Sequence, residues 1–216
     1  MEDNYKTILE WFVGHDKIRP SLMTPFSNED YCFATDAHKL IAIPKTIITL
    51  AVDRDEPALS KKAVEMIVKK PYREYPINTQ YALDVFNPHI NLIDELDKSG
   101  ITECDKCQGE GEVECPCCGN LSECPDCRGT GELGRVIKTG RKIPNPEQRF
   151  LINNVKFKSC NILPVFNAAQ LLNVNTINWV VSEAESANVF KVGDVSIVVM
   201  PMMQTYEDDK GTTIKL

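Results

Sequence analysis

The chain has 216 residues, of which 43% are hydrophobic and 25% charged, and its formal net charge is −7. A chain of this size and composition can bury a core of its own, which excludes a disordered tail and predicts one compact domain or two small ones. The longest unbroken apolar run covers only 197–203, far short of the ~20 residues of a membrane-spanning helix, so no membrane role is expected.

The first residues, Met1-Glu2-Asp3-Asn4, are acidic and polar. A secretory signal would instead be basic and then apolar. We therefore expect no export signal and a cytoplasmic protein.

Helices and strands are predicted on both sides of a cysteine-rich segment. Before it, the patterns predict a helix over 4–13, strands over 31–34 and 40–43 joined by the turn 35–39, a helix over 60–69 capped by Ser60, and a helix over 88–98 closed by Gly100. After it, they predict strands near 135–138 and 150–158, a helix over 165–172, and strands over 177–182 and 195–200. The fold class is therefore α+β.

Seven of the nine cysteines lie between Cys104 and Cys127. Such density in a secreted mini-protein would indicate disulfides, but for this chain we expect no export signal and a core elsewhere. Metal ligation is the better interpretation.

The outer cysteines form a repeat: Cys104-x-x-Cys107-x-Gly-x-Gly returns as Cys124-x-x-Cys127-x-Gly-x-Gly. Two residues between cysteines allow a tight turn to direct both thiolates at one ion, and the glycines supply positive φ angles. The spacing predicts that Cys104, Cys107, Cys124 and Cys127 bind one Zn²⁺. Four thiolates leave no open position, so this zinc would be structural.

The doubled C-x-x-C-x-G-x-G pattern over 104–131 resembles the DnaJ-type cysteine-rich zinc finger. That family carries four repeats and two zinc ions, whereas this chain has two full copies and one partial copy. Its J-domain signature is absent here, so the resemblance implies the finger without the co-chaperone role.

The partial copy contains Cys115, Cys117 and Cys118. Cys115 and Cys118 keep the C-x-x-C spacing and are a second candidate metal pair. The alternative, which we prefer from the sequence, is that all three are spare thiols.

The finger is strongly acidic. Residues 101–134 contain eight acids against Lys106 and Arg128. Such a segment should repel phosphate, so we expect it to contact a protein partner.

Basic residues gather after the finger, where seven between 135 and 160 oppose Glu147 alone. We take Lys138, Arg141, Lys142, Arg149, Lys156 and Lys158 as candidate contacts to nucleic-acid phosphates. A second basic run is formed by Lys61, Lys62, Lys69, Lys70 and Arg73. The alternative is an ordinary solvated surface that balances the acidic finger.

Three further stretches resemble the bacterial DNA polymerase III beta sliding clamp. Residues 29–40, with Ala34-Thr35-Asp36-Ala37-His38-Lys39-Leu40, resemble its "ATDGHRL" strand–turn–strand element, and 192–202 resemble its closing strand with a Met-Pro-Met end. The strand at 150–157 and the helix that follows it resemble the start of a clamp half-domain. Ala37 replaces the family's glycine and Lys39 its arginine. The family's helices direct Lys and Arg toward encircled DNA although the whole protein is acidic.

Together these patterns predict a DNA-clamp-like α+β body, residues 1–100 plus 134–216, with the zinc finger 101–133 inserted. The function they favour is a non-enzymatic factor that binds duplex DNA through its backbone without sequence specificity. A unit this short would need partners, such as further copies, to close a ring. The alternative is a protein-interaction module that docks through the acidic finger. No catalytic motif is present: His15, His38 and His89 are isolated in the sequence, and no phosphate-binding glycine loop appears.

Overall fold

The structure is a computed structural model that describes residues 2–16, 18–48, 56–68, 73–181, 187–202 and 211–216. It divides into two compact units. We call Met1–Asn91 with Asn145–Leu216 the body, and Leu92–Pro144 the arm. The finger predicted over 101–133 lies within the arm, which also contains a strand on either side of it.

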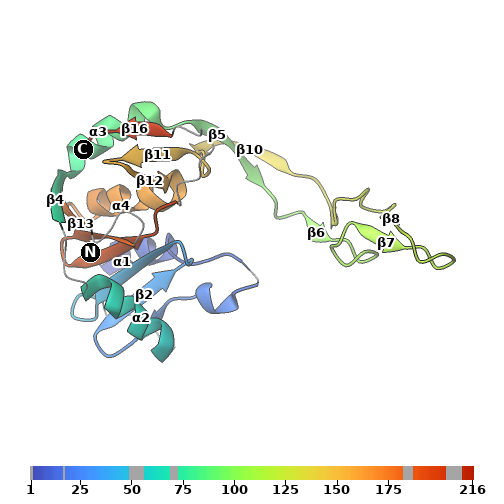
Figure 1. The fold of residues 1–216 in the computed structure, drawn as a ribbon, viewed down its shortest axis with the longest axis horizontal. Coiled ribbons are helices and arrows are strands. Elements are labelled where there is room, and N and C mark those ends of the chain that lie inside the picture. The colour runs from blue at the N-terminus through green and yellow to red at the C-terminus, as the bar shows by residue number, and fades with distance from the viewer. Residues whose placement is uncertain (1, 17, 49–55, 69–72, 182–186, 203–210) are drawn as a thin grey trace. The chain divides into compact units, whose positions relative to one another are not determined.

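The centre of the body is a seven-stranded antiparallel sheet in the order β1-β2-β3-β15-β14-β13-β4 (Figure 1). Its strands are β1 (Phe26–Ser27), β2 (Tyr31–Thr35), β3 (Lys39–Pro44), β15 (Val195–Val199), β14 (Asn188–Val192), β13 (Thr176–Val181) and β4 (Arg73–Asn78). Strand β3 pairs with β15, so segments from the two ends of the chain lie side by side in one sheet.

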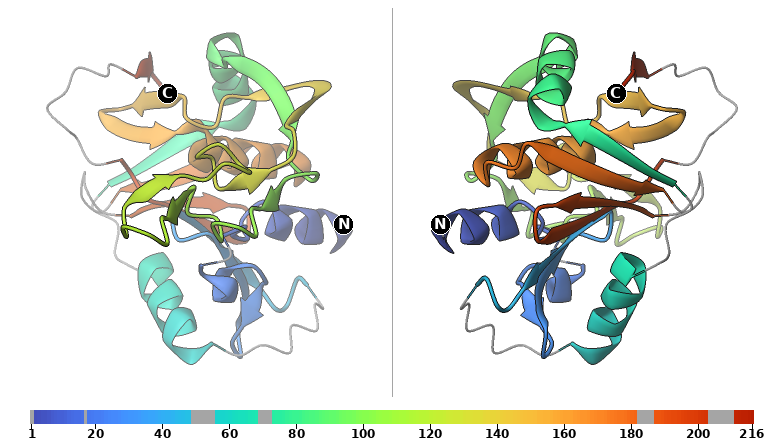
Figure 2. Two further views of the ribbon diagram at one scale, coloured as in Figure 1. Left: turned by 90° about the vertical axis from the view of Figure 1, so that its right-hand side faces the viewer. Right: turned by 90° about the vertical axis from the view of Figure 1, so that its left-hand side faces the viewer.

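Both faces of this sheet are buried. On one face, Cys32, Ile41 and Ile197 pack with the helices α1 (Glu2–Glu10), α3 (Thr79–Phe86) and α4 (Ser159–Leu171). On the other, Phe33, Ala42 and Val198 pack with α2 (Pro57–Val68), which Figure 2 shows on the opposite side from α4. This two-sided burial explains why the central strands are nearly continuous apolar runs instead of alternating ones.

A small second sheet covers α4 from its other side (Figure 1). It consists of β12 (Val155–Lys158), β11 (Arg149–Ile152) and β16 (Thr212–Ile214), with β11 and β16 parallel. The region predicted as one strand over 150–158 is therefore a hairpin. Its turn residues, Asn153 and Asn154, have φ angles of 46° and 68°, as a two-residue hairpin turn requires.

The arm is a series of nested antiparallel pairs. Strand β5 (Leu92–Asp97) pairs with β10 (Ile137–Pro144), β6 (Thr102–Glu103) with β9 (Glu132–Leu133), and β7 (Glu112–Glu114) with β8 (Leu121–Glu123). The predicted helix over 88–98 is therefore wrong, because most of that segment is β5. Its apolar residues have helical spacing, but Asp94 and Glu95 form ion pairs across the ribbon with β10, and these long-range partners override the local pattern.

Two further helix predictions had misplaced starts, and one helix was missed. Ser60 does not cap α2, because the helix begins at Pro57, a residue suited to a first turn, and the Ser60 amide donates to the Glu56 carbonyl. Helix α4 begins at Ser159, before Pro164 and not after it. Helix α3, with the short 3₁₀ turns η1 (Pro20–Leu22) and η2 (Asn87–His89), was not predicted. No described helix is both long and apolar enough to cross a membrane.

The turn between β2 and β3 is fixed by local hydrogen bonds. The Asp36 carboxylate accepts from the amides of His38 and Lys39 and from Lys39 Nζ. The Thr35 hydroxyl donates to the Lys39 carbonyl at 2.7 Å. These bonds hold Ala37 at φ 77°, in the left-handed region that disfavours a Cβ.

Replacing this residue should relieve that strain. Ala37→Gly is expected to raise the free energy of unfolding by up to about 1 kcal/mol, as measured by denaturant titration. The control is Ala58→Gly in helix α2, which should lower it by about 1 kcal/mol. A loss of stability in Ala37→Gly equal to that of the control would contradict strain at the turn.

Candidate metal centre and basic surfaces

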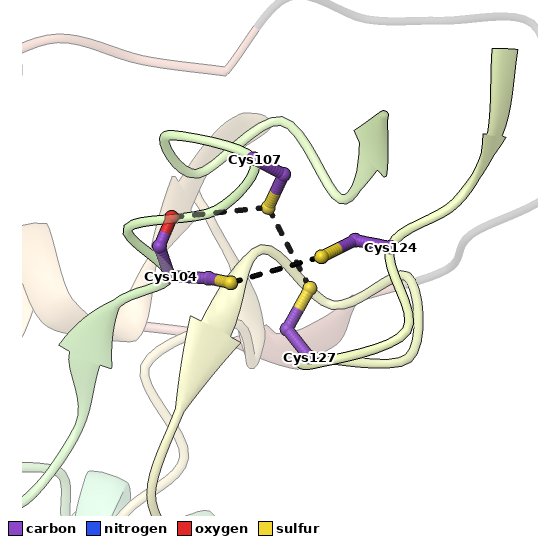
Figure 3. Close-up of side chains that lie close together, drawn as sticks. All are labelled: Cys104, Cys107, Cys124 and Cys127. Carbon is purple, nitrogen blue, oxygen red and sulfur yellow. Dashed lines mark hydrogen bonds between the residues drawn. The ribbon is translucent and has the colours of Figure 1, made fainter. Parts of the chain in front are cut away.

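Four thiols converge in the arm. The sulfurs of Cys104, Cys107, Cys124 and Cys127 all lie within 4.8 Å of one another, and the four residues are buried (Figure 3). Cys104 Sγ lies 3.8 Å from Cys124 Sγ, and Cys107 Sγ lies 3.6 Å from Cys127 Sγ. The structure thus brings together the four residues that the repeat singled out.

These separations fit a metal ion better than disulfides. Four sulfurs placed tetrahedrally at ~2.3 Å from an ion are ~3.8 Å apart, close to both distances. A disulfide needs about 2.05 Å. The cluster can therefore hold one ion, and its four ligands leave no position for a substrate.

Glycine amides donate to two of the four sulfurs. The N–H of Gly111 donates to Cys107 Sγ at 3.3 Å, and the N–H of Gly131 donates to Cys127 Sγ at 3.2 Å. Both glycines have positive φ angles. The second glycine of each C-x-x-C-x-G-x-G copy therefore aims an amide at the second thiolate, which explains why the motif needs glycine there.

The two copies are related by an offset of twenty residues and by reciprocal bonds. The Cys104 amide donates to the Gly131 carbonyl at 2.9 Å, and the Cys124 amide donates to the Gly111 carbonyl at 2.8 Å. Lys106 Nζ lies 2.9 Å from Asp126 Oδ1, which occupies the equivalent place in the other copy. Among the described residues, only Val113 adds partly buried apolar packing to the four cysteines.

The thiol of Cys107 resists ionisation. Burial is the main reason that the pKa of Cys107 rises to about 11. Metal binding must therefore displace a proton from this sulfur, and affinity should fall with acidification.

The three remaining finger cysteines lie apart from this cluster. Cys115, Cys117 and Cys118 form a separate group in the turn between β7 and β8, with Cys117 and Cys118 exposed. Cys115 Sγ lies 2.9 Å from Cys117 Sγ. The structure thus adds Cys117 to the predicted pair of Cys115 and Cys118.

The predicted phosphate contacts fall into two groups. Those on β10 face carboxylates of β5: Lys138 and Lys142 lie 2.7 and 2.5 Å from Asp94, and Arg141 lies 2.7 Å from Glu95. Hydrogen bonds from the two lysines lower the pKa of Asp94 to about 2. A phosphate that recruits these cations must compete with the carboxylates.

The other group lies on the body, on the hairpin β11–β12. Arg149, Lys156 and Lys158 line a cavity of about 640 Å³ together with His38 and Cys160. Lys158 also pairs with Glu147 at 2.7 Å. The cavity is lined by these three basic side chains and by two acids, Asp36 and Glu147, beside the β2–β3 turn.

Of the second basic run, Lys61 and Lys62 are exposed on α2, and Arg73 donates to the Tyr75 hydroxyl at 2.9 Å. Lys69 and Lys70 lie outside the described residues. The described members thus lie on two separate elements, α2 and β4. Helix α4 carries no charged residue, and α1 carries three acids against Lys6.

The sequence did not reveal a second, more apolar cavity of about 350 Å³. It is lined by Thr35, Ala37 and Leu40 of the β2–β3 turn region, by Ala63 and Met66 of α2, and by Val198 and Met200. The signal in the sequence was the resemblance of 29–40 and of 192–202 to one family. These two stretches meet in the structure, where the Met200 amide donates to the His38 carbonyl at 2.8 Å.

No protein-family model and no curated protein sequence matches the chain. Solved bacterial sliding clamps match it in structure. For the Bacillus subtilis DNA polymerase sliding clamp, the TM-score is 0.49 and the identity 13%, over 94% of this chain and 62% of the clamp. For the Pseudomonas aeruginosa DNA polymerase III subunit beta, the TM-score is 0.47 and the identity 12%, over 94% of this chain and 65% of the subunit. For Caulobacter crescentus pol III beta, the TM-score is 0.47 and the identity 10%, over 93% of this chain and 65% of that protein.

The chain thus spans less than two thirds of the length of these clamps. The predicted α+β class is confirmed by the helices and strands themselves, and the structure neighbours have a sliding-clamp fold. The predicted metal-binding cluster is confirmed as four cysteines that could hold an ion. The likeness to the DnaJ-type finger stays a resemblance of sequence.

The glycine amides give a first test of the metal centre. A Cβ at Gly111 would overlap the carbonyl oxygen of Gly129 and disturb the amide that supports Cys107. Gly111→Ala should therefore weaken metal binding on the order of 10- to 100-fold, measured by competition with a chromophoric chelator. Gly100→Ala is the control, because no atom lies within 4 Å of its added Cβ. Equal affinities in the two variants would contradict this role.

The cross-strand pairs give a second test. The folded-state pKa of Asp94, about 2, lies below its ordinary value of 3.8, so its stabilising effect is present above pH 3.8 and is lost as the pH falls through about 2. In the double variant Lys138→Met/Lys142→Met, carboxyl resonances in NMR should show Asp94 titrating near its ordinary value. Lys98→Met should leave the low pKa in place. A wild-type pKa near 3.8 would show that these pairs do not persist in solution.

Proposed function

We propose that this protein is a non-enzymatic, zinc-binding factor whose clamp-like body binds duplex DNA through its phosphates without sequence specificity. One observation carries this proposal. The two stretches that resemble the sliding-clamp family in sequence lie far apart in the chain, yet Val199 pairs with Lys39 in the register of β15 with β3. The Met-Pro-Met end thus lies beside the turn 35–39, as expected if both stretches belong to one clamp-like sheet.

Zinc is the ion proposed for the arm. Four thiolates suit Zn²⁺, Cu⁺ or an iron–sulfur cluster, and a closed tetrahedral set of four cysteines on two C-x-x-C turns is the usual structural zinc site. In this role Cys104, Cys107, Cys124 and Cys127 would hold the ion, and the amides of Gly111 and Gly131 would stabilise two of the thiolates. The ion would supply folding free energy to a segment that has little core.

The DNA contacts are assigned mainly to Arg149, Lys156 and Lys158. Lys138, Arg141 and Lys142 stay candidates, but their ribbon also carries Asp94 and Glu95, so its field is largely compensated. Exposed ion pairs contribute at most about 1 kcal/mol, so they can be displaced, but each displacement leaves a carboxylate near the phosphate. The body cavity also carries Asp36 and Glu147, and Lys158 pairs with Glu147, so both groups face carboxylates. We place the body group first because it belongs to the clamp-like unit. Closing a ring around DNA would require several copies of a chain this short.

A salt titration of DNA binding separates the two groups. Lys156→Glu/Lys158→Glu should weaken binding to linear duplex DNA strongly and reduce the slope of log affinity against log salt by about 2. Arg141→Glu/Lys142→Glu should have a smaller effect. Lys45→Glu/Lys98→Glu, which makes the same change in charge elsewhere, is the control. Equal losses in all three variants would indicate a general charge effect and contradict the assignment.

The alternative function is a protein-interaction module. It is favoured by the acidity of the finger and by the lack of basic residues on α4, since helices of the resembled family direct cations at DNA. Absence of binding to linear and circular duplexes at low salt would overturn the DNA proposal and leave this alternative. Extra retention on circular DNA would support a closed ring.

A further inference from the structure

The turn between β7 and β8 brings three thiols together outside the four-cysteine cluster. The sulfurs of Cys115, Cys117 and Cys118 lie within 4.8 Å of one another. They come from four consecutive positions, so one short turn supplies all three. Such proximity of three soft ligands is the minimum that a thiophilic cation needs to be held by one segment.

The backbone of this turn is held independently of the four-cysteine cluster. The Cys115 amide donates to the Asn120 carbonyl at 2.9 Å, and the Gly119 amide donates to the Cys115 carbonyl at 2.9 Å. Gly119 has a φ angle of 72°, which permits this closure. The hairpin register continues it, with Glu114 opposite Leu121. The thiols are therefore presented by a closed turn and not by a loose loop.

This group differs from the four-cysteine cluster in two ways. In the four-cysteine cluster, each cysteine pair belongs to a C-x-x-C turn whose glycine amide donates to a sulfur. In the β7–β8 turn, the Gly119 amide donates to a carbonyl, and the closest sulfurs are those of Cys115 and Cys117, 2.9 Å apart. The first cluster is buried, whereas Cys117 and Cys118 are exposed. Among the described residues, no fourth cysteine, histidine or carboxylate joins the group.

We propose that Cys115, Cys117 and Cys118 form a second metal site, which binds a thiophilic d¹⁰ cation, Zn²⁺ or Cu⁺, through three thiolates and leaves a coordination position open. Each thiol that binds gives its proton to solvent as its metal–sulfur bond forms. Three thiolates complete a trigonal Cu⁺ site, and they hold Zn²⁺ with a water as fourth ligand. To bind one ion, Cys115 Sγ and Cys117 Sγ must separate from 2.9 Å to ~3.8 Å, and the exposed Cys117 side chain has room for this rotation. Because Cys117 and Cys118 are exposed and Cys115 is only half-buried, this ion exchanges readily, unlike the ion of the closed cluster.

The inference does not depend on DNA binding, and metal stoichiometry tests it. The full chain is reduced with a phosphine and kept without oxygen. Zinc is added, and its release to a chromophoric chelator is followed with time. A second portion, loaded with one equivalent of zinc, is titrated with Cu⁺. The expected result is a second equivalent of metal per chain. It would be either a zinc ion that is released rapidly, or a Cu⁺ ion that binds without releasing the slow zinc, which is the slowly released ion of the four-cysteine cluster.

Variants locate that second ion. Cys117→Ser and Cys118→Ser should each abolish the rapid fraction while the slow zinc stays, and because both side chains are exposed, the fold should tolerate the change. Cys160→Ser in the body is the control and should keep both ions. A rapid zinc with no Cu⁺ uptake would identify a zinc site, and the reverse a copper site. A single equivalent of metal in the wild type, or a second equivalent that survives in both tip variants, would overturn the proposal.

Discussion

The arm depends on the convergence of four thiols. Its finger buries almost no apolar surface beyond the cysteines and Val113, and its strands are only two or three residues long. Hydrogen bonds across such short pairs do not hold a fold in water by themselves. An ion bound by Cys104, Cys107, Cys124 and Cys127 would therefore supply the cohesion that a core supplies in the body, and the glycine amides tie both turns to it.

The body is stabilised in a different way. Its central sheet is buried on both faces, so each of the five inner strands, β2, β3, β15, β14 and β13, contributes side chains to two cores at once. Trp179 is an example of a buried side chain whose apolar and polar parts both have partners. Its ring stacks on Phe190 with centroids 5.6 Å apart, and its indole N–H donates to Asn188. This rigid frame fixes the β2–β3 turn beside the end of β15, where the two cavities share His38 and Met200.

The basic residues after the finger have different surroundings in the structure from those that the sequence suggests. The run of seven basic residues after the finger looks like one surface in the sequence. The structure places three of the seven on a ribbon, where Asp94 and Glu95 compensate them, and three on a hairpin of the body that lines a cavity. The compensating acids lie more than forty residues earlier in the chain, in a segment predicted as a helix, so no local pattern could connect them.

The sequence by itself determined the α+β class, the four members of the cysteine cluster and the pairing of β2 with β3, because these depend on short-range spacing. A C-x-x-C turn directs its own two thiols, and its glycines adopt positive φ angles wherever the turn lies. Tertiary structure alone decided that 92–97 is a strand, that Cys117 joins Cys115 and Cys118, and that α2 and β15 enclose an apolar cavity beside Thr35. Each of these features depends on partners distant in sequence or on the path of a turn. The contacts that stabilise them form only when the chain has folded.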